Sequence, residues 1–176
     1  FLLALALPEH EGPTLTASMS ITALGVFWVG LAVGHAVLLR DLDHGGGLVL
    51  AVLLGTFVGD TAAYLGGRLF GSRRLAPRVS PGKTWEGLFI GMLAAVFAVW
   101  WYGLGSTWMG GGKGALLGLA VALAAPLGDL FESKVKRDAQ AKDAGRLFGA
   151  HGGALDRLDA ALFSIVAGYY VWLLLV

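Results

Sequence analysis

The chain has 176 residues, of which 56% are hydrophobic and 14% are charged, and its mean hydropathy is +0.71. Water-soluble domains carry about 25% charged residues, so this composition excludes an ordinary soluble domain and favours a membrane protein. The sequence contains no cysteine, which excludes disulfides and thiolate metal sites and leaves Asp, Glu and His as the side chains for metal binding.

The first residues, 1–15, are interpreted as the tail of a preceding helix and a connection. Residues 1–7 are apolar but too few to cross a bilayer, and no basic segment of a signal peptide precedes them. We therefore expect residues 1–176 to form a single transmembrane catalytic domain that lacks preceding N-terminal helices.

Five apolar segments follow, each near the roughly 20 residues that a helix needs to cross a bilayer. They cover about 17–39, 48–67, 86–104, 114–131 and 158–176. Lipid offers no hydrogen-bond partner to the open edge of a sheet, so these segments are predicted to be helices and no strand is expected. The predicted fold is an all-α, polytopic membrane bundle of about five transmembrane helices. Small residues in the first helix, Gly25, Gly30 and Gly34, permit close helix packing or a homodimer.

The charged residues are clustered, and the clusters orient the helices. Eleven charged residues lie in 132–159 and six in 68–86. By the positive-inside rule, the basic connections at 68–85 and 132–157 are both cytoplasmic, and the two crossings between them agree with this assignment.

Acidic residues approach the same side from three helices. Asp60 lies late in the second helix, Asp129 lies near the end of the fourth, and Asp156 and Asp159 share one face at the start of the fifth. An Asp inside hydrocarbon costs a few kcal/mol unless it faces a partner or water. Asp156 and Asp159 beside Asp129 therefore predict a cage of oxygen ligands, which suits Mg²⁺. Alternatively, Asp60 pairs with Arg68, and the two acids of the fifth helix only offset its dipole.

The polar segment after the fourth helix supplies hydroxyl and basic groups. If that helix continues past Asp129, then Ser133 and Lys136 or Arg137 fall on the same stripe. Basic groups beside a carboxylate-bound Mg²⁺ are what phosphoryl or nucleotidyl transfer requires, because they neutralise charge on phosphorus oxygens. Basic residues here can also be lipid-headgroup anchors, and His151 before two glycines can be a plain turn.

A second polar element, Ser80, Lys83 and Thr84, precedes the third helix. It is not a P-loop, because Pro77 stands where that motif needs a glycine. One lysine, two hydroxyls and the amides of a helix N-terminus predict a site that binds an anion. The alternative is a simple turn and helix cap.

Together these segments resemble the phosphatidate cytidylyltransferase, or CDP-diacylglycerol synthase, family. The resemblance covers roughly 40–176 and rests on the segments 59–64, 80–87 and 128–133 and on the run 133–159, with Lys136-Arg137, Lys142-Asp143, His151-Gly152-Gly153 and Asp156-Arg157-Leu158-Asp159. It departs from the family at Ala154, where a larger aliphatic residue is usual.

The resemblance implies a Mg²⁺-dependent nucleotidyltransferase that converts CTP and phosphatidate into CDP-diacylglycerol and pyrophosphate. It implies an integral protein of a bacterial inner membrane, with its active site facing the cytoplasm, membrane lipid as a partner and no nucleic acid. Binding of Mg²⁺ is implied for Asp129 and Asp156, with Asp60 as a weaker candidate and a second cation left open. Roles in catalysis are implied for Lys136, Arg137, Lys142, Asp143 and Asp159. Substrate binding is implied for Ser80, Lys83, Thr84, Ser133, His151, Gly152, Gly153 and Arg157.

Two alternatives remain open. A CTP-dependent kinase of a polyprenol-type lipid would need a base for a hydroxyl group, and the intact run 151–159 favours the cytidylyltransferase. A cation transporter would place its acids near the bilayer midplane and would not need eleven charges in one polar segment.

Overall fold

The computed structural model describes residues 14–139 and 155–176, except for the side chains of 155–157. Its helices are α2 (Leu15–Asp41), α3 (Gly45–Phe70), α4 (Trp85–Gly105), α5 (Gly110–Asp138) and α6 (Leu155–Leu175). All five are long and apolar enough to cross a membrane, so the prediction of a polytopic helical membrane protein is confirmed. Outside the described residues lie the expected N-terminal tail and the candidates Lys142, Asp143, His151, Gly152 and Gly153.

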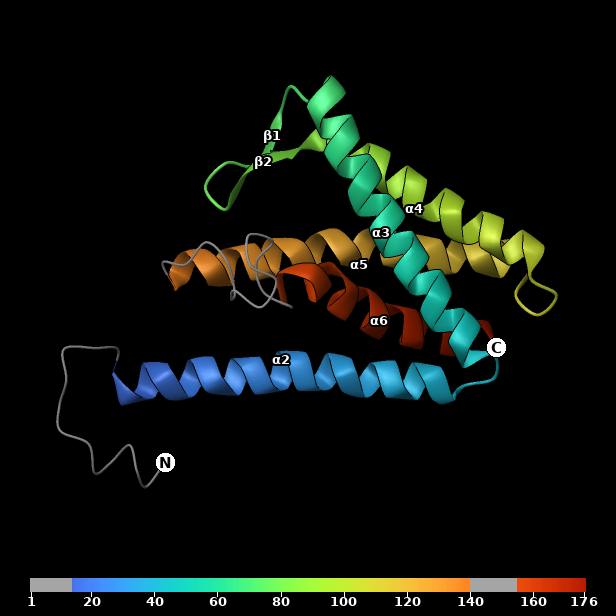
Figure 1. Ribbon diagram of the computed structural model, residues 1–176, viewed down its shortest axis with the longest axis horizontal. Coiled ribbons are helices and arrows are strands. Elements are labelled where there is room, and N and C mark those ends of the chain that lie inside the picture. Colours follow the sequence, from blue (N-terminus) through green and yellow to red (C-terminus); the bar gives the residue numbers. More distant parts are fainter. Residues whose placement is uncertain (1–13, 140–154) are drawn as a thin grey trace.

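A short β-hairpin connects α3 to α4, so the expectation that the chain has no strand is wrong. Its strands, β1 (Arg74–Ala76) and β2 (Ser80–Thr84), are antiparallel. The argument from lipid applies only to backbone inside the hydrocarbon, and the hairpin projects from the end that α3 and α4 share (Figure 1). Extended backbone also suits the start of α4, because the extended N-cap residue Thr84 accepts a hydrogen bond from the Gly87 N–H at 3.1 Å.

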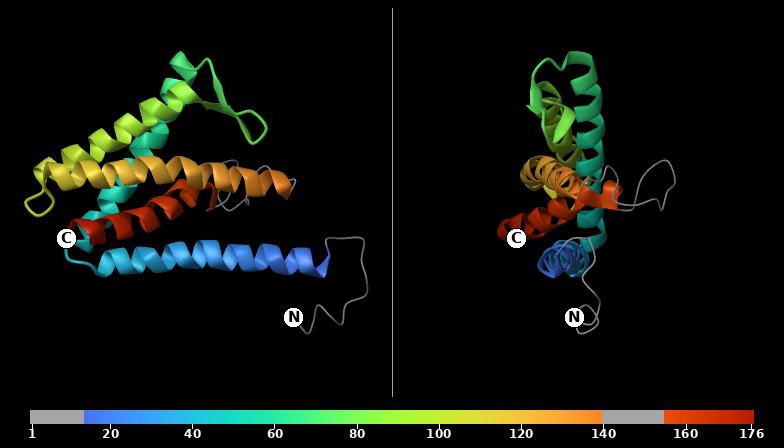
Figure 2. Two further views of the ribbon diagram at one scale, coloured as in Figure 1. Left: turned by 180° about the vertical axis from the view of Figure 1, so that it is seen from behind. Right: turned by 90° about the vertical axis from the view of Figure 1, so that its left-hand side faces the viewer.

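The helices α3, α4, α5 and α6 pack in chain order, each against the next, and α2 lies beside α6 (Figures 1 and 2). Buried aliphatic side chains from α3, α4 and α5, among them Val52, Val99 and Val121, form the common core. Glycine allows α3 and α4 to approach closely: a Cβ atom on Gly87 would lie 2.5 Å from the Ala63 carbonyl oxygen. This close contact positions the hairpin that follows α3.

Helix α2 is the least enclosed helix. Large apolar side chains such as Phe27 are mostly exposed along it. A Cβ atom on Gly25, Gly30 or Gly34 would meet no described atom of another helix within 4 Å. These glycines therefore do not mediate packing among the described helices of this chain.

Candidate active site

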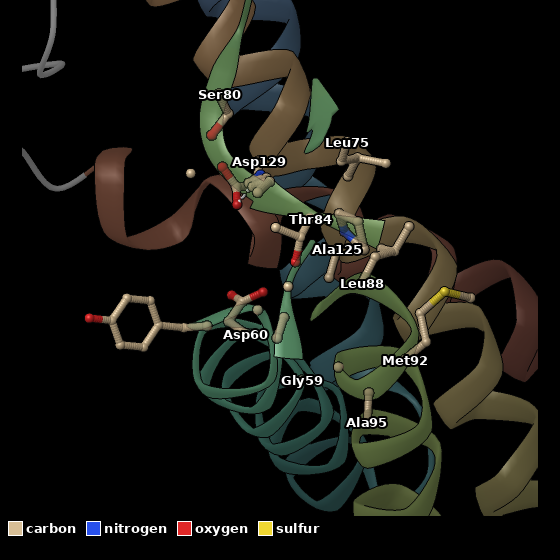
Figure 3. A pocket seen from close by; sticks show the side chains of 18 of the residues that line it. Gly59, Asp60, Leu75, Ser80, Thr84, Leu88, Met92, Ala95, Ala125 and Asp129 are labelled. Carbon is tan, nitrogen blue, oxygen red and sulfur yellow. Dashed lines mark ion pairs between the residues drawn. The ribbon is translucent and has the colours of Figure 1, made fainter. Parts of the chain in front are cut away.

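A pocket of about 840 Å³ lies between α3, the hairpin, α4, α5 and the start of α6 (Figure 3). Pockets of this size hold small-molecule ligands and cofactors. Polar and charged side chains line it near the hairpin: Asp60, Ser80, Lys83, Asp129, Lys136 and Asp159. Farther along the helices its lining is apolar, with Met92 and Ala95 from α4 and Ala122 and Ala125 from α5. The pocket is therefore amphipathic, and its charged part lies at the end of the bundle that carries the hairpin.

Asp129 is central to the charged part of this pocket. Its carboxylate forms an ion pair with Lys83 of β2, and both side chains are half-buried, 32% and 25% exposed. Helix α5 continues past Asp129 to Asp138, and the Ser133 hydroxyl donates to Asp129 Oδ1 at 3.4 Å. The two side chains therefore share one face of the helix, as predicted. Asp60 faces the same space from α3 (Figure 3) and interacts electrostatically with Asp129 and Lys83. Asp60 and Asp129 therefore approach each other from α3 and α5, while the predicted pairing of Asp129 with Asp156 involves a side chain outside the described residues.

The carboxyl groups come from three helices. Asp159 of α6 interacts electrostatically with both Asp129 and Asp60. Asp156 lies on α6 one turn before Asp159, and its side chain is outside the described part. Among the described side chains, no three His, Asp or Glu residues already converge into a metal-binding group. The chemistry of the donors nevertheless fits Mg²⁺, because three carboxylates line one pocket and one of them already binds a cationic group, Lys83.

Glu132 is a charged residue of this region to which the sequence analysis assigned no role. Its side chain is 1% exposed and its carboxylate lies 2.7 Å from the Lys136 Nζ atom. The carboxyl groups of Glu132 and Asp159 are also neighbours. A signal was present in the sequence, because Glu132 stands three residues after Asp129 and four before Lys136, the spacings at which helical side chains meet.

Two groups of hydrogen bonds fix the hairpin over the pocket. Arg137 Nε donates to the Val79 carbonyl oxygen at 3.3 Å, which ties the end of α5 to the hairpin. Glu86 accepts from the Ser72 hydroxyl at 2.6 Å and from the Arg73 N–H at 3.2 Å, which ties the start of the hairpin to α4. These contacts give Arg137 a structural partner in addition to its predicted role toward phosphate.

Of the other predicted substrate-binding residues, two lie in the hairpin and one lies at the start of α6. Ser80 and Thr84 line the pocket, but the Thr84 hydroxyl caps α4, as the alternative interpretation of this segment expected. Arg157 lies on α6, with its side chain outside the described residues.

Residues 1–175 match the sequence family described as the Cytidylyltransferase family. The chain belongs to this family. It is 37% identical to the phosphatidate cytidylyltransferase of Mycobacterium bovis, with 90% of this chain and 52% of the relative covered. For the phosphatidate cytidylyltransferase of Brucella suis, the identity is 42%, with 78% and 51% covered. The chain spans about half the length of the curated relatives it matches.

Membership of the cytidylyltransferase family confirms the resemblance that the motifs indicated. These relatives are bacterial, and the five apolar helices identify an integral membrane protein. The charged pocket coincides with the segments that carried the resemblance, since Asp60, Lys83 and Asp129 all lie within them.

Proposed function

We propose that the protein transfers a cytidylyl group from CTP to phosphatidate. An oxygen of the lipid phosphate forms a bond to the α-phosphorus of CTP, the bond from that phosphorus to the bridging α,β-oxygen breaks, and pyrophosphate leaves. The observation that supports this proposal is the amphipathic pocket, whose charged and apolar parts are continuous. Such a pocket suits two reactants, of which one is a soluble nucleotide and the other has a phosphate headgroup and apolar tails.

The described basic residues supply positive charge to this reaction. Lys83 from the hairpin and Lys136 from α5 line the pocket from different elements, so phosphate oxygens between them meet positive charge from two sides. The lipid phosphate is already ionised at neutral pH and needs no strong base. Positioning and neutralisation of charge therefore supply most of the rate.

The remaining predicted residues complete this proposal. Arg137, Lys142 and Arg157 contribute further charge for the phosphates, Asp143 serves catalysis, and Ser133, His151, Gly152 and Gly153 lie near the nucleotide. Ser80 and Thr84 belong to the opposite wall of the pocket, beside Lys83.

The proposed metal is Mg²⁺. Asp129 and Asp156 would hold it, with Asp159 assisting and Asp60 as a further ligand, and a second cation is compatible with this many carboxylates. When bound, the ion supplies positive charge that offsets the charge of the phosphate oxygens.

The site is proposed to face the cytoplasm. The basic residues of the hairpin and of the end of α5 lie at one end of the bundle, which the positive-inside rule assigns to that side. A pocket there is accessible to soluble CTP and to lipid of the inner leaflet. A homodimer through the open glycines of α2 is a further part of this proposal.

The experiment is a turnover assay on the purified full-length protein in detergent micelles. Pyrophosphate release should require CTP, phosphatidate and Mg²⁺ together and should stop when EDTA is added. Replacing phosphatidate with a polyprenol tests the kinase alternative. Release of CDP with the alcohol, or no pyrophosphate with phosphatidate, would contradict the proposed function.

A further inference from the structure

One carboxylate is buried in the wall of the pocket without lining it. The Glu132 side chain is 1% exposed, and both of its carboxylate oxygens are buried. Among the largest fully buried side chains of the described residues, it is the only one that carries a charge. Removing a carboxylate from water costs several kcal/mol unless an oppositely charged group compensates for it, so the side chain needs a partner of opposite charge.

That partner is Lys136, one turn farther along α5. The Lys136 Nζ atom lies 2.7 Å from Glu132 Oε2, and Lys136 lines the pocket whereas Glu132 does not. The carboxylate is therefore behind the ammonium group, on the side away from the ligand space. Asp159 of α6, which also lines the pocket, is a neighbour of the same carboxylate.

The same helix contains a pair of equal spacing for comparison. Lys134 and Asp138 form an ion pair at i and i+4, and their side chains are 58% and 63% exposed. Neither residue lines the pocket. Exposed pairs of this kind contribute little to stability, because solvent screens them. Burial and contact with the pocket thus distinguish the Glu132 pair from an ordinary surface ion pair.

We propose that Glu132 is a positioning residue, which holds the Lys136 ammonium group at the pocket wall to meet a phosphate oxyanion of a substrate. This inference rests on the proposed function. An unrestrained lysine side chain loses rotamer entropy when it is fixed. A buried carboxylate that fixes the side chain before the ligand arrives removes part of this cost from binding. The oxyanion belongs either to CTP or to phosphatidate, which share the same chemistry.

The test compares four variants of the full-length protein. Glu132→Gln keeps the shape of the side chain and removes its charge, and Glu132→Asp keeps the charge on a shorter side chain. Lys136→Met and the double variant Glu132→Gln/Lys136→Met complete a double-mutant cycle. Asp138→Asn is the matched control. Pyrophosphate release gives kcat, the KM for CTP and the KM for phosphatidate, and the substrate whose KM changes identifies the source of the oxyanion.

Glu132→Gln should raise one of the two KM values by about tenfold, with a smaller change in kcat, because the ammonium group is no longer held in place. Glu132→Asp should raise it less. The double variant should have the KM of Lys136→Met alone, because both substitutions remove the same interaction. Asp138→Asn should stay within about twofold of the wild type.

Other results would overturn the inference. Wild-type values of both KM in Glu132→Gln, or additive effects in the double variant, mean that Glu132 does not act through Lys136. A lower melting temperature with unchanged KM values would give Glu132 a purely structural role. If Glu132→Gln does not fold, Glu132→Asp replaces it, and wild-type KM values there refute the inference. An inactive wild type would instead contradict the proposed function.

Discussion

A substitution of Lys83 tests the proposed substrate site most directly. Its ammonium group is buried and pairs with Asp129, and β2 brings it to the pocket from outside the helix bundle. Lys83→Met keeps most of the aliphatic side chain and removes the charge. If phosphate oxygens bind here, the substitution removes one charge-assisted hydrogen bond to substrate and leaves Asp129 without this partner.

The expected magnitude follows from the burial of the pair. A hydrogen bond to a charged group contributes about 1.5–3 kcal/mol, and at about 1.4 kcal/mol for each factor of ten this corresponds to a loss of roughly 10- to 150-fold in kcat/KM. The pair is only partly exposed, 25% and 32%, so solvent screens it less than a pair on the surface. Steady-state pyrophosphate release with each substrate varied in turn measures the loss.

Lys134→Met is the matched control for this prediction. Lys134 is also a lysine paired with an aspartate, but its side chain is 58% exposed and lies outside the pocket. We expect its kcat/KM to stay within about twofold of the wild type. If Lys83→Met behaves like this control, the segment before α4 is only a turn and a helix cap, and the proposed anion site is wrong.

Three further predictions concern the metal ligands, the helix packing and the apolar part of the pocket. Asp129→Asn and Asp156→Asn should each abolish pyrophosphate release at every Mg²⁺ concentration, and normal turnover in both would remove the metal assignment. Gly91→Val should lower the free energy of unfolding by about 1–3 kcal/mol, because a Cβ atom on Gly91 would lie 2.7 Å from the Gly59 carbonyl oxygen. A lower melting temperature would show this effect. Gly112→Val is the control, since a Cβ atom there meets nothing within 4 Å. Ala125→Phe should raise the KM for phosphatidate more than the KM for CTP, because Ala125 lines the apolar part of the pocket. Leu123 is 53% exposed, so an equal effect of Leu123→Phe would contradict this reasoning.

The five helices were predictable because a lipid environment allows few backbone conformations. A long apolar segment in hydrocarbon must satisfy its backbone internally, so length and composition alone predict a helix. The predicted segment 114–131 is shorter than α5, which reaches Asp138. In its polar end the Ser133 hydroxyl donates to Asp129, and both Asp129 and Lys136 line the pocket, so these side chains share one face of α5, as the spacing suggested.

The hairpin was not predictable by the same reasoning. Its strands have three and five residues, and β2 contains both Pro81 and Gly82, which are uncommon in strands. No alternation of apolar and polar residues marks so short a segment. The hairpin exists because contacts distant in sequence hold it, such as the bond from Arg137 to the Val79 carbonyl, and single-sequence patterns do not contain this information.

The sequence predicted which residues meet at the site better than it predicted which charged groups pair with one another. The order of the crossings places the acids and bases at one end of the bundle, and this was enough to bring Asp60, Asp129 and Asp159 together. The partner of each charge depends on side-chain packing between elements. The pairing of Lys83 with Asp129 could therefore not be predicted from the sequence alone. The helical spacing of Glu132 and Lys136 indicated that these two side chains meet, but not that Glu132 is fully buried.

The two lysines of the pocket differ in how they are tied to their carboxylates. The Lys83–Asp129 pair joins the hairpin to α5, so its two side chains come from different elements and their contact can break by rotation of a side chain alone. The Lys136–Glu132 pair runs along one helix, and its spacing is fixed by the backbone hydrogen bonds of α5. Under the proposed function, an incoming phosphate would draw Lys83 away from Asp129 and leave that carboxylate to a cation, while Lys136 would stay in place. On this proposal, the pocket combines a cationic group that changes partners with one that is held before the ligand binds.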